Sequence, residues 1–198
     1  SDLVDRAEKA RRILMVGHTF LYNAAVRKLR DLIASGEIGD VYYLYSSRLN
    51  LGRIRRDVDA LWNFAPHDIA IASYILDMEP ERVSAQGLSY LQPGIDDVSF
   101  MTIHYPKGIA AHIHVSWLDP HKERKMTVVG SRKMVVYDDV SPDAKIVLFD
   151  RGVDSRQSYP EDVRTFGEFQ LLIRNGDVTV PKIQFEEPLR VEAAHFLE

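Results

Sequence analysis

The spacing of the hydrophobic residues predicts helices near the beginning of the chain and strands along most of the remainder. Apolar residues that recur every three or four positions predict an amphipathic helix that ends at Ser35-Gly36. These residues are Val26, Leu29, Leu32 and Ile33. Residues 41–50 are rich in Tyr, Val and Leu and predict a long strand, whereas residues 53–59 are charged and predict a loop. A second helix is predicted to continue from His67 through Leu76.

Several segments rich in β-branched and aromatic residues follow this second helix. They are residues 82–91, 97–105, 109–118, 125–130, 134–137 and 145–149. Consecutive strands joined by short turns, such as the one at residues 106–108, predict a mainly antiparallel sheet. Residues 150–167 are polar and are predicted to be irregular and mobile, and a last helix is predicted over residues 189–196. We therefore expect an α+β fold in which an open-faced, mainly antiparallel sheet carries helices on one face.

The other face of this sheet is expected to be too apolar to stay fully exposed to water. The apolar side chains assigned to it are Tyr42, Tyr43, Tyr45, Met101, Ile103 and Trp117. A sheet surface of this kind is either protected by charge or covered by a partner. We expect a homo-oligomer that forms through the sheet face.

The first residues of the chain predict a different kind of unit. A short helix is predicted from Asp2 to Arg11, and the apolar run 13–16 predicts a strand that is buried on both faces. A helix followed by such a strand is the unit of a parallel α/β sheet, and one unit has nothing of its own to pack against. We therefore expect this strand to pair with another copy of the chain or to fold back.

Composition narrows the class of protein. The chain has 198 residues, of which 45% are hydrophobic, and this is enough for one sizeable core or for one domain and part of another. The net charge of −4 provides no basic surface for nucleic acid, and the absence of cysteine excludes disulfides and cysteine-ligated metals. No apolar run approaches the length of a membrane span, and no signal peptide is visible. We expect a cytoplasmic protein that binds neither nucleic acid nor membranes.

His67 is the strongest candidate for chemistry. It follows Pro66, and proline is favoured at the first position of a helix, where its missing N–H would be unpaired. The positive end of the helix dipole would then favour a neutral imidazole, which can accept a proton from an alcohol. The alternative is a helix-start histidine that only bonds the local backbone. Asn63 is either a substrate ligand or a helix-entry residue, and Asp68 is expected to cap the first turn.

A cluster of arginines precedes the His67 segment and allows two interpretations. Arg53, Arg55 and Arg56 could clamp a diphosphate or a carboxylate in bidentate fashion. They could equally form a solvated loop that is balanced by Asp57 and Asp59, and we favour this second interpretation.

Two histidines alternate on one predicted strand and raise the question of a metal site. His112 and His114 would project from the same face, but zinc requires a third ligand. A two-residue turn at Lys107-Gly108 would place His104 opposite Ala111 and on the other face of the sheet. We therefore predict no metal site.

Several short motifs follow one another in an order that is similar to that of one enzyme family. They are residues 16–23 (VGHTFLYN), 32–41 (LIASGEIGDV), 62–69 (WNFAPHDI), 96–98 (DDV), 115–120 (VSWLDP), 128–131 (VVGS) and 186–189 (EEPL). Each motif alone is weak, but their order and spacing resemble the C-terminal part of the Gfo/Idh/MocA family of NAD(P)-dependent oxidoreductases. In this resemblance residues 62–69 correspond to the catalytic helix of the family.

The resemblance implies a two-domain enzyme that transfers a hydride between NAD or NADP and a sugar, a cyclitol or a nucleotide sugar. Residues 1–22 would be a remnant βα unit of the nucleotide-binding Rossmann domain, and residues 23–198 would be the substrate and oligomerisation domain. His67 would act as the general acid and base. The candidate substrate-binding residues are Asn63, Arg53, Arg56 and Tyr22. The Trp-Asn-x-x-Pro-His-Asp sequence is most similar to that of dehydrogenases of the UDP-N-acetylglucosamine type.

The chain also departs from the family pattern. It contains no glycine-rich G-x-G-x-x-G phosphate loop and no Glu-Lys-Pro motif. Asn63 occupies a position that is often aspartate in the family, and its amide cannot share a proton as a carboxylate would. The cofactor would therefore be bound mainly by an absent N-terminal domain, and this chain alone is expected to be inactive. The alternative is a non-catalytic binding or assembly module of the same fold.

Overall fold

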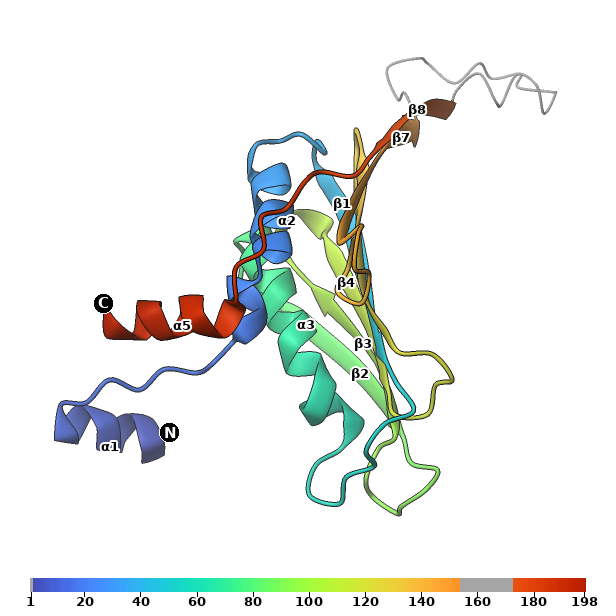
Figure 1. Cartoon of the computed structure of the whole chain (residues 1–198). Helices are drawn as coiled ribbons and strands as arrows, with labels where there is room; N and C mark the ends of the chain where they lie inside the picture. Colours follow the sequence, from blue (N-terminus) through green and yellow to red (C-terminus); the bar gives the residue numbers. More distant parts are fainter. Residues whose placement is uncertain (1, 154–172) are drawn as a thin grey trace.

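The computed structural model describes residues 2–153 and 173–198, and its elements are shown in Figure 1. The helices are α1 (Asp2–Ala10), the 3-10 helix η1 (Thr19–Tyr22), α2 (Ala24–Ala34), α3 (Ala60–Leu76), the 3-10 helix η2 (Pro106–Gly108) and α5 (Pro188–Leu197). The strands are β1 (Val41–Leu49), β2 (Arg82–Leu88), β3 (Val98–His104), β4 (Ala110–Ser116), β5 (Glu123–Gly130), β6 (Met134–Asp138), β7 (Ile146–Val153) and β8 (Ile173–Thr179).

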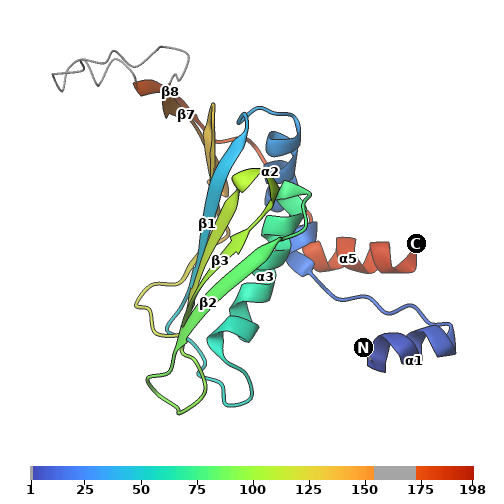
Figure 2. The ribbon, with the colours of Figure 1, turned by 180° about the vertical axis from the view of Figure 1, so that it is seen from behind.

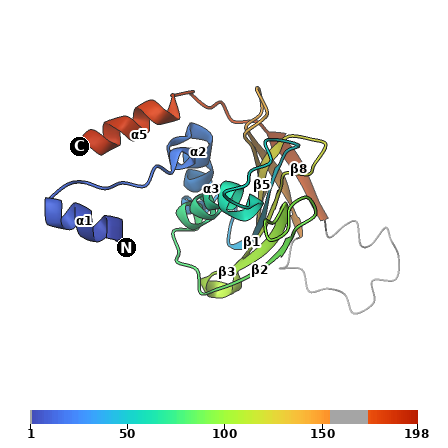
Figure 3. The ribbon, with the colours of Figure 1, turned by 90° about the horizontal axis from the view of Figure 1, so that it is seen from below.

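The described strands form one eight-stranded sheet in the order β2-β3-β4-β1-β5-β6-β7-β8. Strands β1 and β4 are parallel, and the other neighbouring pairs are antiparallel. Helices α2 and α3 pack on one face of the sheet, and no α-helix of the described residues covers the other face (Figures 1 and 3). The predicted α+β fold with an open-faced, mainly antiparallel sheet is confirmed.

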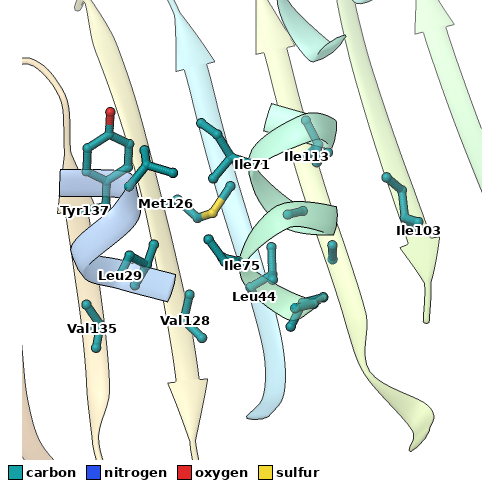
Figure 4. Packing of buried hydrophobic residues seen from close by; sticks show 14 of the residues in the cluster. Leu29, Leu44, Ile71, Ile75, Ile103, Ile113, Met126, Val128, Val135 and Tyr137 are labelled. Atoms are coloured by element: carbon teal, nitrogen blue, oxygen red, sulfur yellow. The ribbon is translucent and has the colours of Figure 1, made fainter. Parts of the chain in front are cut away.

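The hydrophobic core lies between the sheet and the two packed helices. Leu29 of α2 and Ile71 of α3 face the strands, where Leu44 and Val128 lie, as Figure 4 shows. The amphipathic helix predicted from the spacing of apolar residues is α2, which is capped at its start by the side chain of Asn23. This layer fixes α3 against the sheet and so positions everything that α3 carries.

The open face of the sheet is less apolar than the sequence predicted. Tyr43 and Tyr45 lie on it and are 47% and 46% exposed. Met101, Ile103 and Trp117 were assigned to the same face, but they are buried in the core on the helix side. The register explains the first of these errors, because Met101 pairs with Ile113 on β4 and both side chains therefore enter the core.

The beginning of the chain differs from the expectation in one respect. Helix α1 forms as predicted, but residues 13–16 form no strand, and Ile13, Leu14 and Val16 are 73%, 52% and 70% exposed. The expected pairing is not made within this chain, because a lone strand of the parallel type has no neighbour here to share hydrogen bonds with. Helices α1 and α5 both extend away from the sheet on the side that carries α2 and α3 (Figure 2).

The last part of the sheet was only partly predicted. Strand β7 continues to Val153, into a segment expected to be irregular, and it pairs with β8, which the sequence pattern did not indicate. The rest of the segment predicted to be irregular and mobile, residues 154–167, lies outside the described residues. The last predicted helix is confirmed as α5. Within the described ranges, no helix is both long and apolar enough to cross a membrane.

Candidate active site

His67 lies inside helix α3, and the helix begins earlier than the sequence predicted. The side chain of Asp59 caps the helix and accepts a hydrogen bond from the backbone N–H of Trp62 at 2.8 Å, so the helix starts at Ala60 and Pro66 lies in its interior. A proline inside a helix removes one backbone hydrogen bond and costs about 3 kcal/mol. Packing of the buried face of α3 on the sheet stabilises the helix despite this cost. His67 is therefore not at the positive end of the helix dipole.

The imidazole of His67 opens into a cavity of about 1030 Å³. One wall of this cavity is formed by Thr19 and Phe20 of η1, together with Asn23, which follows η1. Other walls come from the turn between β6 and β7 and from residues 180–189, which lead into α5. The cavity therefore brings together segments from the beginning, the middle and the end of the chain around His67.

The environment of His67 favours its neutral form. Burial lowers the pKa of His67 to about 4, and electrostatic interactions with Arg48, Arg124 and His18 act in the same direction. The ring of Phe20 lies against it, with 5.0 Å between the two ring centroids. The imidazole is therefore neutral at pH 7, as the sequence predicted, but the cause is desolvation and nearby cations rather than the helix dipole.

A buried ion pair lies next to His67. Arg48 of β1 donates from Nε to Oδ2 of Asp68 at 2.6 Å and from Nη2 to Oδ1 at 3.4 Å. The side chains of Arg48 and Asp68 are only 5% and 4% exposed. Burial raises the pKa of Asp68, while the guanidinium of Arg48 opposes this rise. The carboxylate of Asp68 thus accepts hydrogen bonds from Arg48 on the sheet and does not cap the backbone of its own helix.

The prediction that Asp68 caps the first turn of the helix is therefore wrong. Asp68 lies in the interior of α3, well beyond the first turn, which Asp59 caps. Arg48 was not predicted as a site residue. A usable signal was present, because an arginine on the inward-facing side of an apolar strand needs a buried partner.

A second group of polar side chains lines the cavity at the turn after β6. Oδ1 of Asp139 accepts hydrogen bonds from the hydroxyl of Tyr137 at 3.1 Å and from Nδ2 of Asn23 at 3.3 Å. Arg124 lies 3.3 Å from its other oxygen, and Lys145 donates to its backbone carbonyl at 2.8 Å. This network holds the Asp139 carboxylate in place on the cavity wall. No local pattern in the sequence marks Asp139, because Asn23 and Arg124 are distant from it in the chain.

The other predicted site residues lie on different elements around His67. Asn63 lies one helical turn before His67 on α3, so the two share a face of the helix. Arg53 and Arg56 belong to the loop before α3 and do not line the cavity. Tyr22 faces α5 instead, where its hydroxyl is hydrogen bonded to Nδ1 of His195 at 2.7 Å. Of the predicted residues, only His67 lines the cavity.

The histidines of the sheet lie on its open face, away from the cavity. His112 is hydrogen bonded to Thr102 at 3.1 Å, and His114 stacks on Phe100 with 4.4 Å between the ring centroids. The prediction for His104 is wrong, because it pairs with Ala110 rather than Ala111 and so lies on the same face as the other two. Even so, the described residues contain no group of three or more His, Asp or Glu side chains that could hold a metal ion.

Sequence comparison decides the family. Residues 26–136, which are more than half of the 198-residue chain, match the GFO/IDH/MocA C-terminal domain. The chain belongs to the GFO/IDH/MocA family. The resemblance seen in the motifs is therefore confirmed, although no curated protein matches the chain.

Solved structures share the fold of this chain. UDP-N-acetylglucosamine 3-dehydrogenase from Acidithiobacillus ferrooxidans is 19% identical with a TM-score of 0.73, over 99% of this chain and 56% of that chain. An inositol dehydrogenase homologue from Azotobacter vinelandii, complexed with NADH and myo-inositol, is 16% identical with a TM-score of 0.66, over 74% of this chain and 42% of that chain. This GFO/IDH/MocA chain thus spans about half the length of the structures that it matches.

Proposed function

We propose that this chain forms the substrate-binding and oligomerisation part of an NAD- or NADP-dependent dehydrogenase. Its substrate would be a hydroxyl group of a sugar, a cyclitol or a nucleotide sugar. The observation that carries the proposal is the neutral imidazole of His67 on the wall of a cavity of about 1030 Å³. Membership of the GFO/IDH/MocA family supports oxidoreductase chemistry.

His67 would handle the proton of the reaction. In the oxidative direction the C–H bond of the substrate breaks as a hydride leaves, and the O–H proton moves to the free ring nitrogen of His67 while the C=O bond forms. The nicotinamide, when bound, supplies the acceptor of the hydride. In the reductive direction the protonated ring returns its proton to the new alkoxide. A ring that is neutral at pH 7 is ready to accept a proton, whereas a charged ring is not.

The polar wall of the cavity would bind the hydroxyl groups of the substrate. Carboxylates accept hydrogen bonds from hydroxyls, and Asp139 is held in place by Asn23 and Tyr137. Lys145 adds a donor on the same wall. Asn63 is retained as a proposed substrate ligand because it lies on the His67 side of α3. Arg53, Arg56 and Tyr22 do not line the cavity, so the proposal does not depend on them.

The described motifs of this chain do not account for binding of the nicotinamide cofactor. The sequence contains no glycine-rich phosphate loop, so its residues do not provide for the pyrophosphate group of NAD or NADP. We propose that a second domain binds most of the cofactor and that the 198-residue chain alone neither binds the cofactor nor turns over substrate. Isothermal titration of the chain with NAD and with NADP tests this, and a measurable affinity for either one would contradict it.

Substitution of His67 tests the function itself. In the full-length enzyme, His67→Asn is expected to lower kcat by about 10²- to 10⁴-fold, because the proton acceptor is lost, with little change in melting temperature. His112→Asn is the matched control, because it makes the same change on the open face of the sheet. Turnover at the wild-type rate in His67→Asn would overturn the proposal and favour a binding or assembly module that does no chemistry.

We also propose that the open face of the sheet joins copies of the chain. Tyr43 and Tyr45 of β1 stack with 6.5 Å between their ring centroids, and Phe100 of β3 stacks on His114 of β4. Exposed aromatic side chains are favoured at the centres of protein interfaces. A second copy would remove these rings from water, and the oligomeric state in solution tests this proposal.

A further inference from the structure

The guanidinium of Arg48 contacts two groups that each lie next to the proposed proton acceptor. We propose that Arg48 is a positioning residue that fixes the orientation of the His67 imidazole by holding Asp68 on one side and Phe20 on the other. This inference rests on the proposed function of His67 and adds a residue to it. Arg48 itself does not line the cavity and would not touch the substrate.

The first contact fixes the backbone of α3. Asp68 follows His67 directly in the helix, and its carboxylate is bonded to Arg48 at 2.6 Å and 3.4 Å. Arg48 belongs to β1, which lies inside the sheet between β4 and β5. The ion pair therefore ties the helical turn that carries His67 to an interior strand, where the backbone is held by neighbours on both sides.

The second contact fixes the ring. The Cζ atom of Arg48 lies 4.5 Å from the centroid of the Phe20 ring, and the Phe20 ring lies 5.0 Å from the His67 ring at an interplanar angle of 58°. The guanidinium therefore contacts the phenyl ring, and the phenyl ring in turn contacts the imidazole at a tilted angle. This contact with Phe20 restricts rotation of the imidazole, and His67 and Phe20 both line the cavity.

The chemistry of arginine suits this double role. Its guanidinium is planar and permanently charged, so one group can bond a carboxylate along its edge and stack on an aromatic ring with its face. Lysine has a point charge and cannot do both. Replacing a buried ion pair by apolar side chains is often neutral or stabilising, so stability alone is a weak reason for burying Arg48 and Asp68.

Arg48 also influences His67 through its charge. Electrostatic interactions with Arg48 of β1, Arg124 of β5 and His18 each lower the pKa of His67. Asp68 on the same helix and Asp139 on the β6–β7 turn carry the nearby negative charge. Arg48 thus holds the ring in place and also disfavours its charged form.

Four variants of the full-length enzyme test the positioning role. R48K keeps the charge and removes the planar group, R48M removes both, and F20L keeps the ion pair and removes the aromatic ring that contacts both Arg48 and His67. R30M is the matched control, because Arg30 also stacks on a ring, that of Tyr74 at 4.4 Å, and pairs with an aspartate, Asp77 at 3.3 Å, but it lies on α2 away from the cavity. The readouts are kcat, KM, the pH profile of kcat/KM and the NMR titration of His67.

We expect R48K to lower kcat by about 10- to 100-fold with a smaller change in KM, because a misplaced ring is a poor proton acceptor. F20L is expected to lower kcat to a similar extent and also to change KM, because Phe20 lines the cavity. R48M is expected to have the same effect as R48K and also to raise the pKa of His67, which moves the acidic limb of the pH profile to higher pH. R30M is expected to behave as the wild type. All rates are compared well below the melting temperature of each variant, so that unfolding does not contribute.

Two results would overturn the positioning role. One is wild-type kcat and an unchanged His67 titration in both R48K and F20L. The other is an equal loss of kcat in R30M, which would indicate a general effect of removing an arginine. His67→Asn separates this failure from that of the proposed function. If His67→Asn is inactive while R48K and F20L are normal, only the role of Arg48 fails; if His67→Asn is active, both proposals fail.

Discussion

The two faces of the sheet are built by the same strands, yet they offer opposite environments. On the covered face, Leu44 and Ile113 are 0% and 1% exposed, and the buried Arg48–Asp68 ion pair lies in the same layer. On the open face, Tyr45 of β1 is 46% exposed and histidines rather than aliphatic residues occupy β4. The alternation of a strand therefore separates a buried side that packs against the helices from an exposed side that is suited to association.

The largest expected difference in stability between the two faces comes from neutralising the acidic partner of an ion pair. Asp68→Asn leaves the guanidinium of Arg48 buried without its anionic partner and is expected to lower the free energy of unfolding by about 3–5 kcal/mol. Asp138→Asn makes the same change in the Lys125–Asp138 pair of the open face, where the side chains are 45% and 21% exposed and the expected loss is below about 1 kcal/mol. Urea denaturation of both variants measures the difference. Equal losses would show that the covered face is wetter than its burial indicates.

A smaller difference is expected between two neighbours on one strand. Ile113→Ala removes a side chain from the core and is expected to lower the free energy of unfolding by about 2–5 kcal/mol through lost burial and a cavity. His112→Ala, one position earlier on β4, points to the open face and is expected to cost less than about 1 kcal/mol. Thermal and urea unfolding check both values. A costly His112→Ala would mean that its bond to Thr102 matters more than its exposure suggests.

The sequence predicted helix α2 and strand β1 well because their patterns are local, whereas Met101, Ile103 and Trp117 were assigned to the wrong face. Helix α2 follows from apolar residues at helical spacing, and β1 from a run of strand-forming residues. The start of α3 was misplaced because Pro66 resembles a first helical position, whereas Asp59 provides the actual cap. Strand β8 was missed because its residues 173–179 are largely polar and exposed, so they show no alternation.

The candidate site was harder to predict because its contacts are not local. His67 was found from its own motif, but Arg48 and Asp68 meet only when a strand packs against a helix. Asp139 reaches the cavity through a turn that is far from His67 in the chain. Periodicity assigns a residue to a face, but it does not say which residue of another element lies opposite. The chemistry of the covered face therefore became visible only with the fold.

The pH dependence of stability tests how far burial on the covered face lowers the pKa of His67. The folded pKa of His67 is about 4 and its ordinary value is 6.5, so the unfolded state binds more protons between these values. The free energy of unfolding is therefore expected to fall as pH is lowered from about 6.5 to about 4, by on the order of 1 kcal/mol once screening of the half-buried ring is allowed for. His67→Asn is expected to flatten this dependence. Urea denaturation at a series of pH values checks this, and an unchanged slope in His67→Asn would contradict the assignment.

The smallest effect on folding, and the most specific effect on assembly, is expected on the open face. Tyr45→Glu places a charge in the middle of the exposed aromatic surface and is expected to weaken self-association while leaving the unfolding of a dissociated chain nearly unchanged. Tyr90→Glu is the control, because Tyr90 is also exposed, at 67%, but lies in a loop outside the sheet. Sedimentation velocity over a range of concentrations measures both. If Tyr45→Glu and Tyr90→Glu associate equally well, another surface must join the copies, and the exposed rings of the sheet need a different explanation.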